Sequence, residues 1–314
     1  MPSLKFRQLK SATQVKFNSN YKAGLIIKNY NMLQVQNFRS IVDNYKIIFF
    51  DAFGVLKSYN GLVPGIEKTF EYIEQQGKEY YIVTNDASRS PKQLAETYHR
   101  MGLDAIQHGR IISSGMLAKE YLDLKVSEGI VAYLGTHNSA HYIDSTGLHT
   151  LPVSAINQQN MENVSALVLL DDEGYNWFDD LNKTVNILRK RTIPAIVANT
   201  DNIYPLSGSN EVSIAIGGIA TMIESIVGKR FLRFGKPDSQ IFMFAYDLIR
   251  ERMTISKKDI LMVGDTLHTD IIGGNKFGLD TVLVLSGNTS PDDAYTRIRA
   301  SGIMPTYVCE TAVV

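Results

Sequence analysis

The polar side chains of this sequence that could perform chemistry together follow short apolar runs. They come after KIIFF, EYYIV and DILMVG, with one more in FGKPDSQ, and they are Asp51, Thr84, Asn85, Asp265, Asp270 and Lys236. A carboxylate can attack phosphorus, hydroxyl and amide groups can hold phosphate oxygens, and a lysine can neutralise charge. Further carboxylates are the hard oxygen ligands that Mg²⁺ prefers. The set therefore has the components of a phosphoryl-transfer site.

The role expected of each residue follows from its chemistry. Asp51 is the expected nucleophile, because its carboxylate stands at the end of an apolar run. Lys236 would neutralise the nucleophile and the phosphoryl group, and Thr84 would hold phosphoryl oxygens together with backbone N–H groups. Asp265 would bind Mg²⁺ with Asp51, supported by Asp270. Taken singly, such residues are more often turn residues or helix caps, so the prediction depends on their combination.

Short apolar runs rich in Val, Ile and Tyr would position these side chains. They are typical of strands buried on both faces, and they are KIIFF, EYYIVT, ALVLL, AIVAN, DILMVG and TVLVL. Helical patterns such as IEKTFEYIEQQG, SPKQLAETYHRMG and DSQIFMFAYDLIRERM lie between several of them. This alternation predicts an α/β fold with a parallel sheet. Ligands bind at the carboxyl ends of such strands, where the polar side chains fall.

Length and composition exclude several classes of protein. The chain has 314 residues, 44% of them hydrophobic, which predicts a large core and two domains. The sequence has 32 basic residues (lysine and arginine) and 32 acidic residues, and this balanced charge argues against a nucleic-acid partner. The single cysteine excludes an intramolecular disulfide framework, and no apolar run is long enough for a membrane span. We expect a cytoplasmic protein without a membrane partner.

The order of the motifs resembles the haloacid dehalogenase (HAD) superfamily, specifically its class IIA branch of NagD-like and pyridoxal phosphate phosphatase-like hydrolases. The matching segments span roughly residues 46–290 and are FFDAFGVL, LVPGIEKTFEYI, IVTNDASRSP, ANTDNIYP, FGKPDSQIF and MVGDTLHTDIIGGNKFGLDTVLVLSG. The resemblance implies a Rossmann-like core with a parallel sheet, Mg²⁺ held partly by the backbone carbonyl of Phe53, and a small phosphorylated metabolite as substrate. A homodimer is common among the proteins that the chain resembles.

The motif spacing predicts where a second domain is inserted. Only 32 residues separate Asp51 from Thr84, whereas about 150 separate Thr84 from Lys236. A whole α/β domain fits into the longer interval, which is the class IIA arrangement of an inserted C2-type cap. We expect an N-terminal extension over 1–40, a HAD core domain over 41–86 and 233–314, and an inserted α/β cap domain over 87–232.

One polar turn of the predicted cap belongs to the expected site. The segment ending in IPAIVANTD is typical of a strand followed by a polar turn. In the family that the chain resembles, this turn faces the active site. We therefore expect Asn199, Thr200 and Asp201 near the substrate, next to Thr84 and Asn85, with a surface turn as the alternative.

Phe53 departs from the motif of the family. The usual motif is Asp-x-Asp, and its second acid protonates the leaving alcohol and then activates water. Such catalysis typically contributes about 10²–10⁴-fold, and its loss would slow alkyl esters most. Other groups that could supply the proton are His137, His141, Asp201 and His268.

Three activities remain open for a site with this departure. The first is a phosphohydrolase that obtains its proton elsewhere. The second is a slow or inactive relative that binds a phosphorylated ligand or a protein partner. The third is a dehalogenase, which needs no proton for the leaving group, but dehalogenases insert their cap directly after the first motif and need no metal. Because this chain lacks that insertion and keeps Asp265 and Asp270, the phosphohydrolase is favoured.

Overall fold

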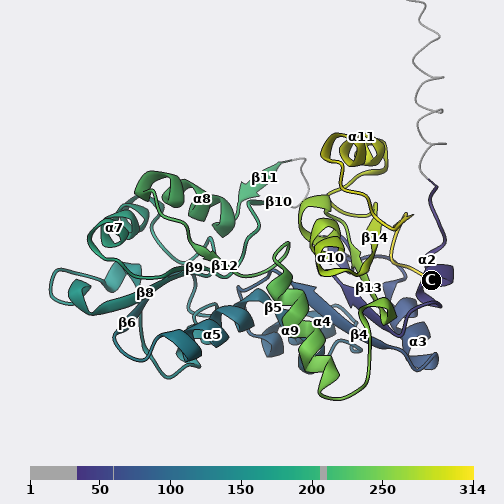
Figure 1. Cartoon of the computed structure of the whole chain (residues 1–314), viewed down its shortest axis with the longest axis horizontal. Helices are drawn as coiled ribbons and strands as arrows, with labels where there is room; N and C mark the ends of the chain where they lie inside the picture. The colour runs from purple at the N-terminus through teal and green to yellow at the C-terminus, as the bar shows by residue number, and fades with distance from the viewer. Residues whose placement is uncertain (1–33, 59, 206–210) are drawn as a thin grey trace, which may run out of the picture. The chain divides into compact units, whose positions relative to one another are not determined.

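Six parallel strands form the sheet that carries the predicted site residues (Figure 1). Their order is β15-β14-β13-β1-β4-β5, so β1 lies between β13 and β4. The predicted apolar runs form strands here because both faces of the sheet are covered and their side chains are buried. The strands are β1 (Ile47–Phe50), β4 (Glu79–Thr84), β5 (Ile111–Ser113), β13 (Ile260–Gly264), β14 (Asp280–Val284) and β15 (Tyr307–Cys309).

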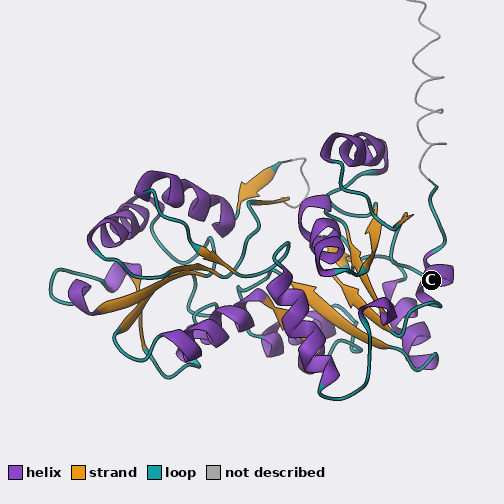
Figure 2. Cartoon of the chain, in the orientation of Figure 1, coloured by secondary structure: helices purple, strands orange, loops and turns teal. Residues whose placement is uncertain are grey.

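Helices, drawn in purple in Figure 2, surround this sheet, and their apolar side chains pack on both of its faces. One face packs on residues of α2, α3 and α4, and the other packs on residues of α9 and α10. The start of α4 is fixed by a capping box, in which Ser90 and Gln93 bond each other's backbone N–H, with Pro91 following. The helices are α2 (Phe38–Val42), α3 (Ile66–Gln75), α4 (Pro91–Arg100), α9 (Ser239–Arg250), α10 (Ile272–Phe277) and α11 (Pro291–Ser301).

A second parallel sheet has the strand order β12-β9-β8-β6-β7. One of its faces packs on α7 and α8, and α5 and α6 supply side chains to the other. Its strands are β6 (Ile130–Leu134), β7 (His149–Pro152), β8 (Val164–Leu169), β9 (Ala195–Val197) and β12 (Leu232–Arg233). Its helices are α5 (Ser114–Lys125), α6 (His141–Asp144), α7 (Trp177–Lys190) and α8 (Ile216–Val227).

Two antiparallel hairpins and several short helical turns complete the described elements. The hairpins are β2 (Lys57–Ser58) with β3 (Gly61–Leu62), and β10 (Ile203–Pro205) with β11 (Val212–Ile214). The 3₁₀ turns are His108–Arg110, Val153–Ala155, Met161–Asn163 and Lys257–Asp259, and a π-helical turn covers Leu267–Ile271.

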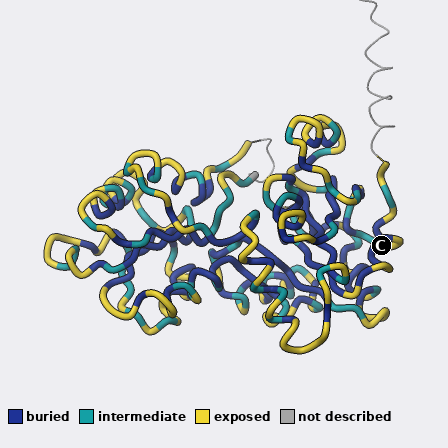
Figure 3. Tube along the Cα trace, viewed as in Figure 1, coloured by how far each residue is buried: buried dark blue, intermediate teal, exposed yellow. Residues whose placement is uncertain are grey.

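A single hydrophobic cluster contains residues of both sheets. It includes Phe49 and Tyr81 from the first sheet and Val131 and Val168 from the second, together with Leu122 from α5. The buried stretches of the chain follow the strands of each sheet (Figure 3). The two sheets therefore share part of their hydrophobic core.

The sheet pairings differ from the sequence-based assignment at the start of the inserted segment, and by one residue, Arg233, at its end. The cap was expected over 87–232, yet β5 pairs with β4 in the first sheet, and β12 pairs with β9 in the second. Ile111–Ser113 is too short to show a periodic pattern, so a further core strand could not be predicted there. We propose that the inserted unit begins after α5 and ends with β12.

The computed structural model describes residues 34–58, 60–205 and 211–314. Most of the N-terminal extension predicted over 1–40 lies outside these residues. Its described part contains Val35, which forms a β-bridge with Val308, and the start of α2. Within the described residues, no helix is long and apolar enough to cross a membrane.

Candidate active site

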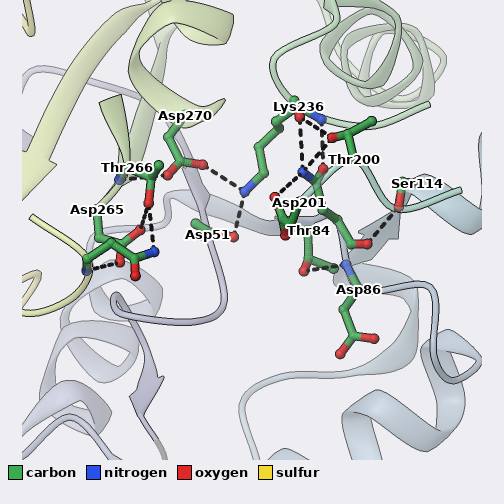
Figure 4. Close-up of polar contacts among 12 residues, drawn as sticks. Asp51, Thr84, Asp86, Ser114, Thr200, Asp201, Lys236, Asp265, Thr266 and Asp270 are labelled. Atoms are coloured by element: carbon green, nitrogen blue, oxygen red, sulfur yellow. Dashed lines mark hydrogen bonds and ion pairs between the residues drawn. The ribbon is translucent and has the colours of Figure 1, made fainter. Parts of the chain in front are cut away.

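The ends of β1 and β13 and the π-helical turn after β13 bring three carboxylates together, and Lys236 contacts two of them (Figure 4). Lys236 Nζ lies 2.5 Å from Asp51 Oδ1 and 2.7 Å from Asp270 Oδ1. Each of Asp51, Asp265 and Asp270 offers one oxygen, and these oxygens all lie within 4.8 Å of one another. The folded chain thus brings together four of the six residues from which the sequence argument started.

Asp265 is held in a fixed orientation by two donors. Thr266 Oγ1 donates to its Oδ1 at 2.8 Å, and the backbone N–H of Asn288 donates to its Oδ2 at 2.6 Å. The Thr266 backbone N–H donates to Asp270 Oδ2 at 3.1 Å, so one residue orients both acids. Sequence reasoning assigned no role to Thr266 and did not find Asn288. Asn288 could have been found by the same strand-end argument, because it follows the run TVLVL.

Two glycines allow the backbone to approach the Asp265 carboxylate. Gly54 has a φ of +78°, and a Cβ atom on either Gly54 or Gly287 would overlap Asp265 Oδ2. A Cβ at Gly287 would also approach the Gly54 Cα to 2.6 Å. Because only glycine lacks this atom, the turn after β1 and the loop after β14 can close around Asp265.

The site carries more negative than positive charge, and this imbalance shifts its pKa values. Burial, followed by the charge of Asp270, raises the pKa of Asp265 to about 7 and also raises that of Asp51, although Lys236 opposes the shift. Burial alone would lower the pKa of Lys236, but the charges of Asp270 and Asp51 raise it above the ordinary lysine value. The ammonium is therefore protonated at neutral pH.

The donor set fits a divalent cation. Three carboxylates face one ammonium in a buried site, which leaves negative charge uncompensated when all three are ionised. Hard oxygen donors at this spacing suit Mg²⁺ or Ca²⁺. Asp51 and Asp265 would hold such an ion, and Phe53, whose carbonyl is the third expected ligand, lies in the turn directly after Asp51.

Asn85 connects the first sheet to the polar turn after β9. Its Nδ2 lies 3.0 Å from Thr200 Oγ1, 2.9 Å from Asp201 Oδ1 and 3.0 Å from the Lys236 carbonyl oxygen. Its Oδ1 accepts a 2.7 Å hydrogen bond from the Lys236 backbone N–H. Thr200 and Asp201 therefore lie beside Lys236, and the hydrogen bonds of Asn85 hold the backbone of Lys236 in place.

The other predicted binding residues have different surroundings. Thr84 is buried, and its Oγ1 accepts a hydrogen bond from the Asp86 backbone N–H at 3.1 Å, which leaves its hydroxyl hydrogen for another acceptor. Asn199 instead accepts from the Asp201 backbone N–H at 2.9 Å. This Asx turn is the alternative that the sequence left open, and Asn199 shapes the turn that presents Asp201.

The groups considered as replacements for the missing acid at position 53 are not equally placed. His137, His141 and His268 are all exposed. Asp201 lies inside the site, where burial raises its pKa and its Oδ1 accepts from Asn85. Of these four groups, Asp201 alone is in contact with the described polar network around Lys236.

Comparisons with known proteins agree with this architecture. A family model described as haloacid dehalogenase-like hydrolase matches residues 48–149, and a HAD-hydrolase-like model matches residues 233–312. A crystal structure from Cytophaga hutchinsonii, described as a possible sugar phosphatase of the HAD superfamily, is 69% identical, with a TM-score of 0.87, over 90% of this chain and 99% of that chain.

More distant relatives also match most of the chain. NagD from Escherichia coli K-12 is 24% identical over 86% of this chain and 97% of its own, with a TM-score of 0.69. Chronophin from Bos taurus is 27% identical over 280 residues, which are 87% of this chain and 93% of that protein. These matches cover both sheets, as do the predicted motifs. The chain therefore belongs to the haloacid dehalogenase superfamily of hydrolases, in its NagD-like class IIA branch.

Proposed function

We propose that this chain is a Mg²⁺-dependent phosphohydrolase that acts on a small phosphorylated metabolite through an aspartyl-phosphate on Asp51. The observation that carries the proposal is the contact of Lys236 with Asp51 and Asp270, with Asp265 next to them at the end of β13. Phosphoryl transfer requires a nucleophile, a positive charge beside it and a cluster of acids that can bind a metal ion. Asp51, Lys236 and the three carboxylates provide these groups.

The reaction follows from the positions of these groups. An Asp51 oxygen attacks phosphorus, the bond from phosphorus to the ester oxygen breaks, and water then releases phosphate and restores the carboxylate. Lys236 neutralises charge on the nucleophile and the phosphoryl oxygens, and Thr84 donates its hydroxyl hydrogen to one of those oxygens. Bound Mg²⁺ would neutralise further phosphoryl charge. Asn85 and the turn at residues 199–201 would position the substrate beside Lys236.

The names of the relatives support a small phosphate ester as substrate. Besides the sugar phosphatase description, they include phosphoglycolate phosphatase 2 from Arabidopsis thaliana and glycerol-3-phosphate phosphatase from Gallus gallus. A structural neighbour from Mycobacterium tuberculosis, a glycerol phosphate phosphatase, was crystallised with calcium. All of these names describe enzymes that hydrolyse a phosphomonoester, and they differ in the alcohol that leaves.

Phe53 determines which esters the enzyme hydrolyses well. Without a general acid at position 53, an alkyl leaving group departs unprotonated, whereas an aryl oxide departs readily. We predict Mg²⁺-dependent turnover of 4-nitrophenyl phosphate with much slower turnover of an alkyl phosphate, measured as phosphate release. Phe53→Asp should raise alkyl turnover by about 10²-fold or more and change aryl turnover less.

Asp51→Asn is the control for this assay, because it removes the nucleophile and keeps the shape of the side chain. All turnover should disappear in this variant. Aryl hydrolysis that survives in Asp51→Asn, or that persists without a divalent cation, would contradict the proposed mechanism.

A second candidate function is a binding protein for a phosphorylated ligand, and Phe53 is the observation that favours it. This protein would hold the phosphoryl group with Lys236 and Thr84 but release no phosphate. Absence of turnover with both ester classes, together with saturable Mg²⁺-dependent binding of the phosphate ester by calorimetry, would support this candidate instead.

A further inference from the structure

Lys57 is a cation that the proposed reaction does not use, although it belongs to the turn that presents Asp51. Its backbone N–H donates to the Ala52 carbonyl at 3.2 Å, and its carbonyl accepts from the Gly54 N–H at 2.8 Å. It also begins the β2–β3 hairpin, where it pairs with Leu62. The position of Lys57 relative to the nucleophile is therefore fixed by the backbone.

The Lys57 side chain lies against aromatic rings rather than against an acid. Its Nζ is 5.8 Å from the centre of the Phe53 ring and 5.2 Å from that of Tyr98. The residue is half-buried, and burial lowers the pKa of its ammonium. Among residues 34–58, 60–205 and 211–314, no ion pair or hydrogen bond of this ammonium is present. Aromatic faces attract a cation only weakly, by about 0.5–2 kcal/mol, so a stronger anionic partner can be accommodated.

The charges around Lys57 also suit an incoming anion. Asp51 and Asp86 lie close enough to influence its ammonium but not within ion-pair distance. Oδ1 of Asp86 is already occupied by the backbone N–H and the hydroxyl of Ser88. Arg89 places a second positive charge near Lys57. Two neighbouring cations repel each other unless an anion lies between them.

We propose that Lys57 binds a second anionic group, a carboxylate or a further phosphate, on the leaving group of the substrate. The inference rests on the proposed phosphohydrolase function. In the motif of the family, the residue at position 53 is the acid that protonates the leaving oxygen, and Lys57 Nζ lies 5.8 Å from the centre of the Phe53 ring. The leaving group would therefore pass the ammonium as it departs, so Lys57 selects substrates by charge.

The test compares aryl esters that differ only in charge, because aryl leaving groups need no proton. The substrates are 3- and 4-carboxyphenyl phosphate, their neutral carbamoylphenyl counterparts, and 4-nitrophenyl phosphate. We expect the wild type to show a KM for a carboxyphenyl ester roughly tenfold below that of its carbamoyl counterpart. Lys57→Met should abolish this difference, and Lys57→Arg should retain it.

The outcomes separate this inference from the proposed function. Lys68→Met removes a charge from an exposed position of α3 and should change neither KM. Turnover of 4-nitrophenyl phosphate without a preference for the carboxylate, a preference that survives Lys57→Met, or an equal loss of kcat on all esters would each overturn the role of Lys57 while leaving the phosphohydrolase intact. If the wild type hydrolyses none of the esters, the proposed function fails and this inference fails with it.

Discussion

Asp265 is a proposed metal ligand, and its burial should make metal binding depend on pH. Burial and the charge of Asp270 raise its pKa to about 7, so below that pH the carboxyl carries a proton that a metal ion must displace. Its ligand form dominates above that pH. We predict that Mg²⁺ binds about tenfold more tightly at pH 8 than at pH 6, measured by calorimetry. Asp265→Asn should remove most of this dependence, and an affinity independent of pH would contradict the assignment.

The glycines around Asp265 give a second prediction for single residues. Gly287→Ala places a methyl group where Asp265 Oδ2 now lies, so the carboxylate must move. A displacement of about 1 Å at a reacting centre can cost roughly 10²-fold in rate, and we expect a loss in kcat/KM of that size. Gly109→Ala is the matched control, because a Cβ there meets nothing within 4 Å. Equal activity of the two variants would show that Asp265 does not need this close approach.

The sequence predicted individual residues best where several motifs supported one another. Asp51, Lys236 and Asp265 were expected together because each follows a strand or precedes a helix, and parallel strands end at the same edge of a sheet. Lys57 was not found, because a lone lysine in a turn has no spacing that distinguishes it from a surface residue. The Asx turn of Asn199 likewise depends on backbone geometry rather than on residue type.

The N-terminal cap of helix α4 makes a contribution to the stability of the fold that can be measured. Ser90 Oγ accepts from the Gln93 backbone N–H, so Ser90→Ala should lower the free energy of unfolding by about 1 kcal/mol in urea denaturation. Because α4 carries Tyr98 next to Lys57, the same variant should also raise the KM of carboxylate-bearing substrates.

Asn176→Ala is the comparison for this helix cap. The Asn176 side chain caps α7 by accepting from the Phe178 and Asp179 backbone N–H groups, far along the chain from the first sheet. The Asn176→Ala variant should lower the free energy of unfolding by a similar amount and leave the KM of carboxylate-bearing substrates unchanged. If both variants alter KM equally, α4 has no specific connection with the substrate.

At the scale of elements, the strength of the local signal determined what could be predicted. The run EYYIVT forms β4 and the run DILMVG forms β13, because each is long, apolar and rich in β-branched or aromatic residues. Ile111–Ser113 forms β5 with only three residues, and its pairing with β4 is decided by tertiary contacts. Assignment of a short strand to one sheet or the other therefore requires the folded structure.

The cluster shared by the two sheets predicts how the described part of the molecule unfolds. Because Phe49 and Val168 belong to one continuous core, neither sheet keeps all of its packing when the other is lost. We predict a single transition, in which the fluorescence of Trp177 on α7 and the loss of Mg²⁺-dependent activity change together. Leu122→Ala should shift both signals equally, at a cost of about 2–5 kcal/mol. Separate transitions would show that the sheets unfold independently.

The strand order has a consequence during synthesis. β1 lies between β4, which follows it closely in the chain, and β13, which begins at residue 260. A ribosome-bound chain that lacks this segment leaves one edge of Ile47–Phe50 unpaired and apolar while the whole inserted unit is being made. The strand that leads to Asp51, the proposed nucleophile, is thus a part of the nascent chain that a chaperone would protect.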